Sequence, residues 1–545
     1  MSTKASFTPI EPQANRWPIT LLHKNQKAFL REVVEKSFNA LCARHTLDGA
    51  LYRILDQTTS RELARIASDP WSCDPKDDRS FWETMASSIE NKAAATTLLK
   101  NVLERYVGEI CSYFSVRHYQ YIAKCTHHTF IHLLKPHCFG FGAAPDRWTF
   151  QHKRLQEKFH LMGQVDRVRA LAQIGTVVLV PTHTSHWDSV VIGLAMQQLG
   201  LPPLTWGAGL NLFNNRGFRY VFNKLGTYKV DRRKKTIPYL QVQKDYACQI
   251  LEWGCHTLFY PGGTRSRLGA IESDLKLGLL GTPFDAQEAN FQNQGGATAK
   301  KLFIVPIVLN YHCVLEATQL IGESVQMESG AAAVVQQGCC CTSLQFSKNI
   351  LLKGSEIFIN IGSPLDVMGN RVDLEGRSYD DHGQAIDLYQ QFRDLPIKTA
   401  TRKRSDDYVK ALSHKIVAAY YAINTVLSSH LVAFVAYELA KKRGGGAIEL
   451  TDSVVPHADF MVALAHTHKA LELLYTAQKI DFTPIVRGGQ LDAIAKDGCA
   501  KLGVYHARKP LVVTEDGNLR IQDPLTLFYY HNRLTGYGLE AIFSA

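Results

Sequence analysis

The stretch TVVLVPTHTSHWDSVVIGLAMQQLG, residues 176–200, decides the fold. Its first part, Val177–Val180, is an apolar, β-branched run typical of a strand buried on both faces. Pro181 ends that run, and from Trp187 the apolar spacing changes to that of a helix, which ends near Gly200. A strand, a short polar turn and a helix predict one unit of an α/β sheet, and such turns often carry chemistry.

The polar turn holds His183, His186 and Asp188 within six residues. A histidine held by a carboxylate is a general base, because the carboxylate fixes the tautomer and stabilises the imidazolium. Two alternatives stay open on this stretch alone. Ser185 and Asp188 can form a capping box with both histidines only packing, or His186 can be the base instead of His183.

Further apolar runs predict the rest of an α/β fold. They lie at 176–181, 257–260, 302–309 and 356–361, with helical patterns such as 239–253 between them. We predict a mainly parallel sheet covered by helices, with an α-helical N-terminal domain and a largely helical C-terminal region. The predicted boundaries are 1–140, 141–370 and 371–545, and residues 319–347 are expected to form a loop insertion.

Charge and cysteine content limit the partners and the compartment. The net charge is +11 over 545 residues, which favours anionic partners, although a mildly basic soluble surface is the plainer interpretation. The basic runs lack interleaved aromatic residues, so we expect no nucleic acid partner. Twelve cysteines without a CxxC pair predict free thiols in a reducing compartment, and the run Cys339–Cys341 predicts a solvated loop.

Histidines and cysteines also cluster between Cys125 and Cys138. His128 and His132 are spaced to share one helix face and to hold zinc with either cysteine. Polar ring-bearing residues near a helix end are more common as contacts between domains, so we predict no metal site.

One segment, residues 416–436, contains no Asp, Glu, Lys or Arg. Its length is close to the roughly 20 apolar residues that a transmembrane helix needs. Four polar residues interrupt it, namely Asn424, Ser428, Ser429 and His430. We therefore predict a buried or membrane-lying helix and not a span.

Three further stretches are suited to anion binding or to the core. In Gly226–Lys235, five of the last seven residues are cationic, which predicts either a phosphate clamp or a solvated or lipid-facing basic patch. Phe259–Gly269 follows a strand and combines glycines with Arg265 and Arg267. Leu302–Asn310 is by itself a core strand. No Walker loop, GxSxG elbow, HExxH motif or kinase signature is present.

Together these four stretches, in this order, resemble the motif blocks of the glycerolipid acyltransferase superfamily, and most of all its glycerol-3-phosphate acyltransferase branch. The blocks are HxxxxD at His183–Asp188, an arginine-ended block at Gly226–Arg232, an EGTRS-like block at Gly262–Arg267 and a Val-Pro-Ile strand at Val305–Ile307. The flanks at Ala208–Leu212, Lys276–Leu280, Asn310–Tyr311, Glu316 and Tyr529–Arg533 agree as well. The resemblance is strong over residues 175–365.

The resemblance implies an acyl transfer to the sn-1 hydroxyl of glycerol 3-phosphate, which gives lysophosphatidic acid in the first step of phospholipid synthesis. It implies that His183, oriented by Asp188, is the base. The substrate-binding residues would be Arg232, Gly263, Thr264, Arg265 and Arg267. The donor would be acyl-CoA or acyl-carrier protein, and no other cofactor is implied.

Two departures from the family pattern stand out. Gly262 replaces the glutamate usual in the third block, and Thr227–Lys229 replaces more aromatic and aliphatic residues. Alternatives are therefore lysophosphatidate or dihydroxyacetone phosphate as acceptor, or a non-catalytic membrane-lipid-binding scaffold.

Because the implied product is a lipid, we expect peripheral or monotopic association with the cytoplasmic face of a membrane. The expected contacts are Lys234–Lys235, Arg402–Arg404, Lys441–Arg443 and the segment 416–436.

Overall fold

The computed structural model describes residues 7–46, 49–90, 95–134, 158–329, 355–394, 401–444 and 450–544. Cys339–Cys341, His137 and Cys138 lie outside these ranges, as do the side chains of His128 and His132.

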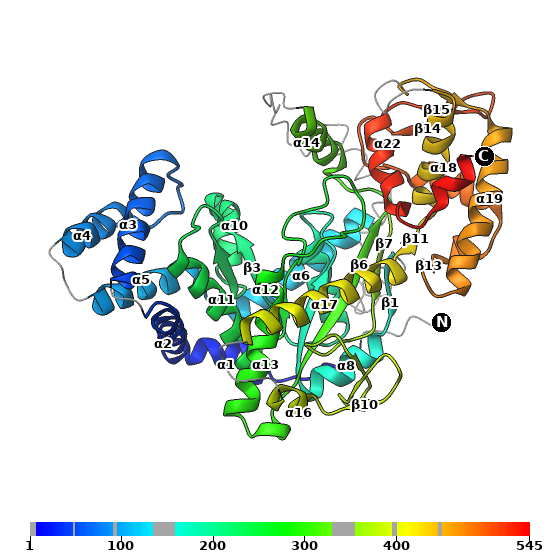
Figure 1. Ribbon diagram of the computed structural model, residues 1–545. Coiled ribbons are helices and arrows are strands. Elements are labelled where there is room, and N and C mark those ends of the chain that lie inside the picture. The colour runs from blue at the N-terminus through cyan, green and yellow to red at the C-terminus, as the bar shows by residue number, and fades with distance from the viewer. Residues whose placement is uncertain are drawn as a thin grey trace, which may run out of the picture.

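A seven-stranded sheet forms the centre of the molecule (Figure 1). Its strands are β1 (Phe159–Gly163), β2 (Thr176–Pro181), β3 (Thr205–Gly209), β4 (Thr227–Val230), β5 (Thr257–Leu258), β6 (Leu302–Tyr311) and β7 (Ile357–Ile361). They lie in the order β1-β7-β6-β2-β5-β3-β4. The five strands from β6 to β4 are mutually parallel, and only the β6–β7 pair is antiparallel. The predicted fold class, a mainly parallel sheet covered by helices, is confirmed.

Alternate side chains of β2 and β6 enter two different cores. Val177 and Leu179 pack on the face that carries α9 (Asp188–Gln198) and α18 (Ser428–Lys442). Val178 and Val180 pack on the opposite face, which carries α13 (Thr282–Asn293) and α17 (Thr401–Ile423). Every residue of β2 and β6 is buried, which explains why both strands read as continuous apolar runs.

Most helices of the N-terminal region lie together at the β4 end of the sheet (blue in Figure 1). They are α1 (Pro18–Lys24), α2 (Gln26–Arg44), α3 (Ala50–Ser68), α4 (Asp78–Glu90), α5 (Ala95–Ile110) and α6 (Val116–Leu134). The buried residues of α2 and α5 share one core with those of α11 (Ile237–Glu252). The helical character predicted for this region is confirmed.

The C-terminal region is largely helical, as predicted, with short strands between its helices. Besides α17 and α18 its helices are α16 (Leu388–Arg393), α19 (His457–Thr476), α20 (Pro484–Arg487), α21 (Leu491–Lys501) and α22 (Pro524–His531). Its strands are β8 (Arg371–Val372), β9 (Ser378–Tyr379), β10 (Ala385–Ile386), β11 (Thr425–Val426), β12 (Val454–Val455), β13 (Asp481–Phe482), β14 (Leu511–Val513) and β15 (Leu519–Ile521).

The apolar segment 416–436 is not one helix. It holds the end of α17, the short strand β11 and the first part of α18, and nearly all of α18 is buried inside the protein. Asn424 ends the first helix and donates from Nδ2 to the carbonyl oxygen of Arg533 at 3.2 Å. From Asn424 on the segment is buried in the protein, which is one of the two predicted alternatives, whereas residues 417–423 of α17 include partly exposed ones. Contact of this exposed part with a membrane stays a prediction. Over the residues that the structure describes, no helix combines the length and hydropathy needed to cross a bilayer.

Three smaller features complete the comparison with the sequence. The beginning of the predicted loop 319–347 belongs to a helix, α14 (Ala317–Ser329), and the remainder lies outside the described residues. The strands β1, β3 and β4 were not predicted. Three further helices, α8 (Val165–Ile174), α10 (Arg216–Phe222) and α12 (Leu277–Leu280), lie between strands. The predicted domain boundaries stay a prediction.

Candidate active site

His183 and Asp188 face each other in the turn between β2 and α9. His183 Nδ1 lies 2.9 Å from Asp188 Oδ2, so Nε2 is the ring nitrogen open to a reactant. The imidazole stacks on the ring of Tyr260 at a centroid distance of 3.9 Å and an interplanar angle of 19°. Tyr260 in turn is hydrogen-bonded through its hydroxyl to Ser189 at 2.9 Å. The ring of His183 is thus fixed at its edge and on one face.

Asp188 is fully buried, and its carboxylate accepts several hydrogen bonds. Oδ2 also accepts the backbone N–H of Thr184 at 2.6 Å and of Ser185 at 2.8 Å. Oδ1 accepts the hydroxyl of Tyr311 at 2.7 Å. These donors offset the cost of burying a charge. Because α9 begins at Asp188 and its N-cap is Trp187, Ser185 and Asp188 do not form the capping box that the sequence left open. The bond from Ser185 N–H instead holds the turn against the same carboxylate that contacts His183.

A second carboxylate, that of Glu316, braces the same turn from beyond the end of β6. It accepts the hydroxyl of Ser185 at 3.0 Å and the backbone N–H of His186 at 2.9 Å. Arg265 Nη1 lies 3.9 Å from the same carboxylate. Glu316 therefore joins the first block to the third. The side chain of His186 is exposed, and burial of part of its ring together with the nearby Arg265 cation lowers its pKa.

The third block runs alongside the first and is joined to it by its backbone. Ser266 N–H donates to the carbonyl oxygen of His183 at 2.8 Å. Gly263 adopts a φ of +78° and donates its N–H to the Tyr260 carbonyl at 3.0 Å. An oxyanion bound at the Gly263 N–H would have to compete with the Tyr260 carbonyl oxygen, which already accepts this N–H. Thr264 is exposed, and Arg267 Nε lies 3.9 Å from Glu323.

The five cations of the second block do not act as one group. Arg232 is exposed and donates from Nη2 to the Gly263 carbonyl at 2.9 Å, so it lies beside the third block. Arg233 turns the other way, where it bonds Asp74 and Asp231 and stacks on Trp71 at 3.9 Å. The single phosphate clamp that the sequence allowed is therefore reduced to Arg232.

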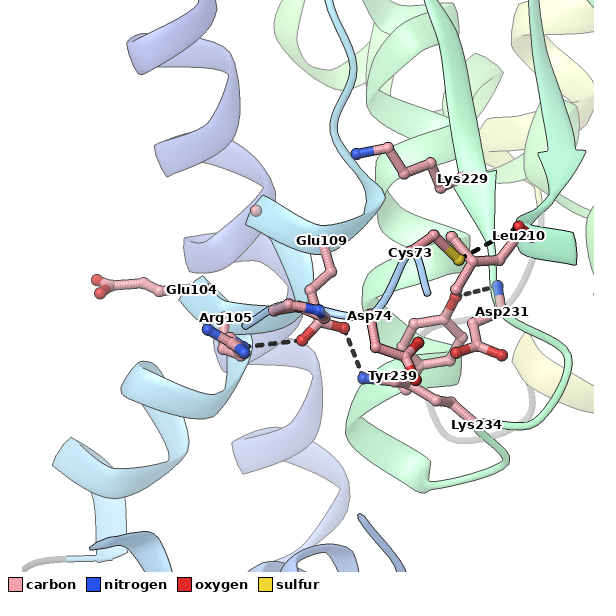
Figure 2. Close-up of a pocket in the computed structure, with 12 residues that line it drawn as sticks. Cys73, Asp74, Glu104, Arg105, Glu109, Leu210, Lys229, Asp231, Lys234 and Tyr239 are labelled. Carbon is pink, nitrogen blue, oxygen red and sulfur yellow. Dashed lines mark hydrogen bonds and ion pairs between the residues drawn. The ribbon is translucent and has the colours of Figure 1, made fainter. Parts of the chain in front are cut away.

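Lys234 is buried next to the N-terminal helices, where it bonds Glu109 at 2.5 Å and lies 3.4 Å from Glu62. Lys234 lines a cavity of about 430 Å³. Figure 2 shows its side chain between α5 and the end of β4. Lys229 also lines this cavity, and burial lowers its pKa. Lys234 holds two parts of the protein together, so its predicted contact with a membrane is wrong.

The C-terminal motif at residues 529–533 supports the third and fourth blocks from behind. Asn532 donates to the Leu268 carbonyl at 2.9 Å. The buried Arg533 donates to Asn310 Oδ1 at 2.8 Å and to the Leu309 carbonyl at 2.7 Å. These residues position the loops. Tyr529, Tyr530 and Arg533 also line a small cavity together with Thr184 of the turn that holds His183.

Four residues at the site escaped the sequence reasoning or entered it only as flanks. Tyr311 is the last residue of β6 and Glu316 follows it, and since β6 is parallel to β2, the shared edge of the sheet was an available signal. Tyr260 lies two residues before the third block. Glu272 accepts the backbone N–H of His183 at 2.9 Å, and no local pattern points to it. Within the described part of the chain no group of three or more metal-ligating side chains occurs.

Residues 164–310 match the family model described as Acyltransferase. This range runs from the start of α8 into β6 and contains all four blocks. The chain therefore carries an acyltransferase domain over these residues.

Proposed function

We propose that the protein transfers a fatty acyl group from an acyl thioester to the sn-1 hydroxyl of glycerol 3-phosphate. The observation that carries the proposal is the meeting of a carboxylate-held histidine with two arginines at one edge of the sheet. His183 is joined to the third block by Ser266, Arg265 belongs to that block, and Arg232 lies beside it. A base beside guanidinium groups suits an acceptor that carries both a hydroxyl and a phosphate.

In the proposed reaction His183 Nε2 takes the proton of the sn-1 hydroxyl. The oxygen attacks the thioester carbonyl carbon and forms a tetrahedral intermediate. The carbon–sulfur bond then breaks, and the thiolate takes the proton back from the imidazolium. No acyl-enzyme is needed, since a thiol with a pKa of about 8.5 is a good leaving group. Positioning of the hydroxyl by the arginines lowers the barrier by several kcal/mol, on the order of what orientation supplies elsewhere.

Membrane association remains part of the proposal, and fewer contacts support it than the sequence suggested. Lys235 and Lys441–Arg443 are exposed, although Arg443 pairs with Asp459. The side chains of Arg402–Arg404 lie outside the described residues. We propose peripheral binding to the cytoplasmic face of an anionic membrane through these basic groups.

The test of this function is a panel of acceptors and donors with the purified protein. Glycerol 3-phosphate, dihydroxyacetone phosphate and lysophosphatidate are each offered with acyl-CoA and with acyl-carrier protein. We expect the highest kcat/KM with glycerol 3-phosphate. Faster turnover of another acceptor would favour that alternative. Absence of turnover together with flotation on anionic vesicles at low salt would favour the non-catalytic scaffold. Protein that does not bind such vesicles would contradict the proposed peripheral membrane binding.

Arg232→Gln is expected to raise KM for glycerol 3-phosphate by about tenfold or more, because one charge-assisted contact to phosphate is lost. Since Arg232 is exposed, the free energy of unfolding should change by less than about 1 kcal/mol. Initial rates over a range of acceptor concentrations and urea unfolding provide the two measurements. Lys235→Gln is the matched control, an exposed neighbouring cation that should leave KM unchanged. An unchanged KM in Arg232→Gln would remove this arginine from the site.

A further inference from the structure

Gly262, where the motif block that this stretch resembles has glutamate, is not surrounded by empty space. A Cβ built on Gly262 would lie 2.7 Å from the carboxyl carbon of Glu272 and 2.9 Å from both of its oxygens. Real Cβ atoms do not approach other atoms so closely. The carboxylate of Glu272 thus occupies the volume that a side chain at position 262 would fill, and the two positions depend on each other.

The loop between the third block and α12 folds back to bring this carboxylate into place. Lys276 N–H donates to the Pro261 carbonyl at 2.7 Å, which closes the loop. Ser266 Oγ donates to the Ala270 carbonyl at 2.9 Å and fixes the middle of the loop. Ile271 is buried in the core beneath the sheet and anchors the segment directly before Glu272. The backbone at Glu272 is therefore held in place by the loop, and the carboxylate is held by its bond from His183 N–H.

Glu272 makes one direct contact with the proposed base. Its Oε1 accepts the backbone N–H of His183 at 2.9 Å. The pKa of Glu272 is raised to about 7, mainly by burial and in small part by the nearby Asp188, although the bond from His183 N–H and the Arg533 cation oppose the shift. The backbone of His183 is thereby held at both ends, by Glu272 at its N–H and by Ser266 at its carbonyl oxygen.

We propose that Glu272 is a positioning residue for His183. Glu272 lies where the loop folds back toward the third block, and it supplies there the carboxylate that Gly262 lacks. The proposal rests on the proposed function in that His183 is taken as the base. A backbone hydrogen bond to the residue that carries the imidazole limits how far its ring can shift, and a displacement of about 1 Å costs roughly 10²-fold in rate. In this proposal the carboxylate of Glu272 takes the place of the carboxylate that a glutamate at position 262 would supply.

The first test is to move the carboxylate. Glu272→Ala is expected to lower kcat about 10- to 100-fold, with KM for glycerol 3-phosphate changed less than about threefold. Gly262→Glu alone should also lose activity, because its side chain collides with Glu272. The double variant Gly262→Glu/Glu272→Ala should recover at least about fivefold over Glu272→Ala. Full activity in Glu272→Ala, or a double variant no better than it, would overturn the proposal.

Two variants guard against an effect of folding. Glu272→Gln keeps an oxygen that can accept the His183 N–H, so it should retain more than about a third of kcat. If Glu272→Gln and Glu272→Ala have the same kcat, the hydrogen bond is not what Glu272 supplies. Gly322→Ala in α14 is the control for adding a Cβ, because a Cβ built at Gly322 meets no neighbouring atom within 4 Å. This variant should leave kcat unchanged.

A measurement without turnover separates this proposal from the proposed function. Hydrogen exchange of the peptide that contains the His183 amide should quicken in Glu272→Ala and stay slow in Glu272→Gln. Glu62→Gln, at a buried carboxylate among the N-terminal helices, should leave that peptide unchanged. If the wild-type protein transfers no acyl group and the variants still show this exchange pattern, the proposed function is refuted and the contact between Glu272 and His183 is supported. Unchanged exchange in Glu272→Ala would refute the contact itself.

Discussion

His183→Ala is expected to lower kcat for acyl transfer by about 10³-fold, which is the usual range for loss of a general base. The fold should persist, because Asp188 keeps its hydrogen bonds from Thr184 N–H, Ser185 N–H and the Tyr311 hydroxyl. The backbone bonds of residue 183 to Glu272 and Ser266 do not need the imidazole either. KM for the acceptor should change little, since the arginines remain.

The matched control is His186→Ala, three residues away in the same turn. The side chain of His186 is exposed, and its contact with Glu316 is made by the backbone N–H, which alanine retains. We expect less than about a threefold loss of kcat. Single-turnover rates and urea midpoints for both variants provide the measurement. If His186→Ala is the more damaging variant, the base has been assigned to the wrong histidine. If the wild-type protein binds vesicles without turnover and neither variant changes that binding, the scaffold alternative is favoured.

The centre of the sheet could be predicted from the sequence because its strands are buried on both faces. The run at 176–181 coincides with β2, and the run at 302–309 covers most of β6. β3 escaped because it reads Thr-Trp-Gly-Ala-Gly, and glycine has low strand propensity. The structure gives the reason for one of these glycines, since a Cβ on Gly207 would lie 2.7 Å from the ring of Tyr228 on β4. That neighbour is twenty-one residues away and unknown to a local pattern.

The apolar segment 416–436 shows a second limit of the sequence. Its polar residues suggested a helix that avoids spanning a membrane, and all four are buried in the protein. Ser428 Oγ bonds Asp497 at 2.6 Å, and Ser429 Oγ lies 2.8 Å from His312 Nδ1. A buried polar group needs a partner, and here the partners come from distant parts of the chain. The composition of the segment indicates that it avoids water. Only the tertiary fold shows whether protein or lipid covers it.

At the site, residues within one motif could be paired from the sequence, whereas those joined across motifs could not. His183 and Asp188 lie five residues apart and do contact each other. The basic run at 229–235 looked like one cluster, and it divides because Asp74 and Glu109 attract Arg233 and Lys234 away from the edge of the sheet. A charge pattern gives the number of cations, and the distant acids decide which of them face a substrate.

Asp188→Asn is the second substitution with a large expected effect, and it should lower kcat about 10²-fold or more. The amide can keep the geometry. Its oxygen can take the place of Oδ2, which accepts from His183 Nδ1 and from two backbone N–H groups, and its NH₂ can donate to the Tyr311 hydroxyl oxygen. What is lost is the negative charge that stabilises the imidazolium formed when His183 takes the proton.

Tyr311→Phe separates charge from packing in the same cluster. It removes the hydroxyl that bonds Asp188 Oδ1 and leaves the carboxylate in place beside His183. We therefore expect a loss in kcat of less than about tenfold. In contrast, Asp188→Ala leaves two buried backbone N–H groups without an acceptor and should reduce the free energy of unfolding by about 3 kcal/mol. A single-turnover series of the three variants, with urea unfolding for each, gives the measurement. If Asp188→Asn keeps wild-type kcat while remaining folded, the carboxylate only holds the turn and the imidazolium needs no partner.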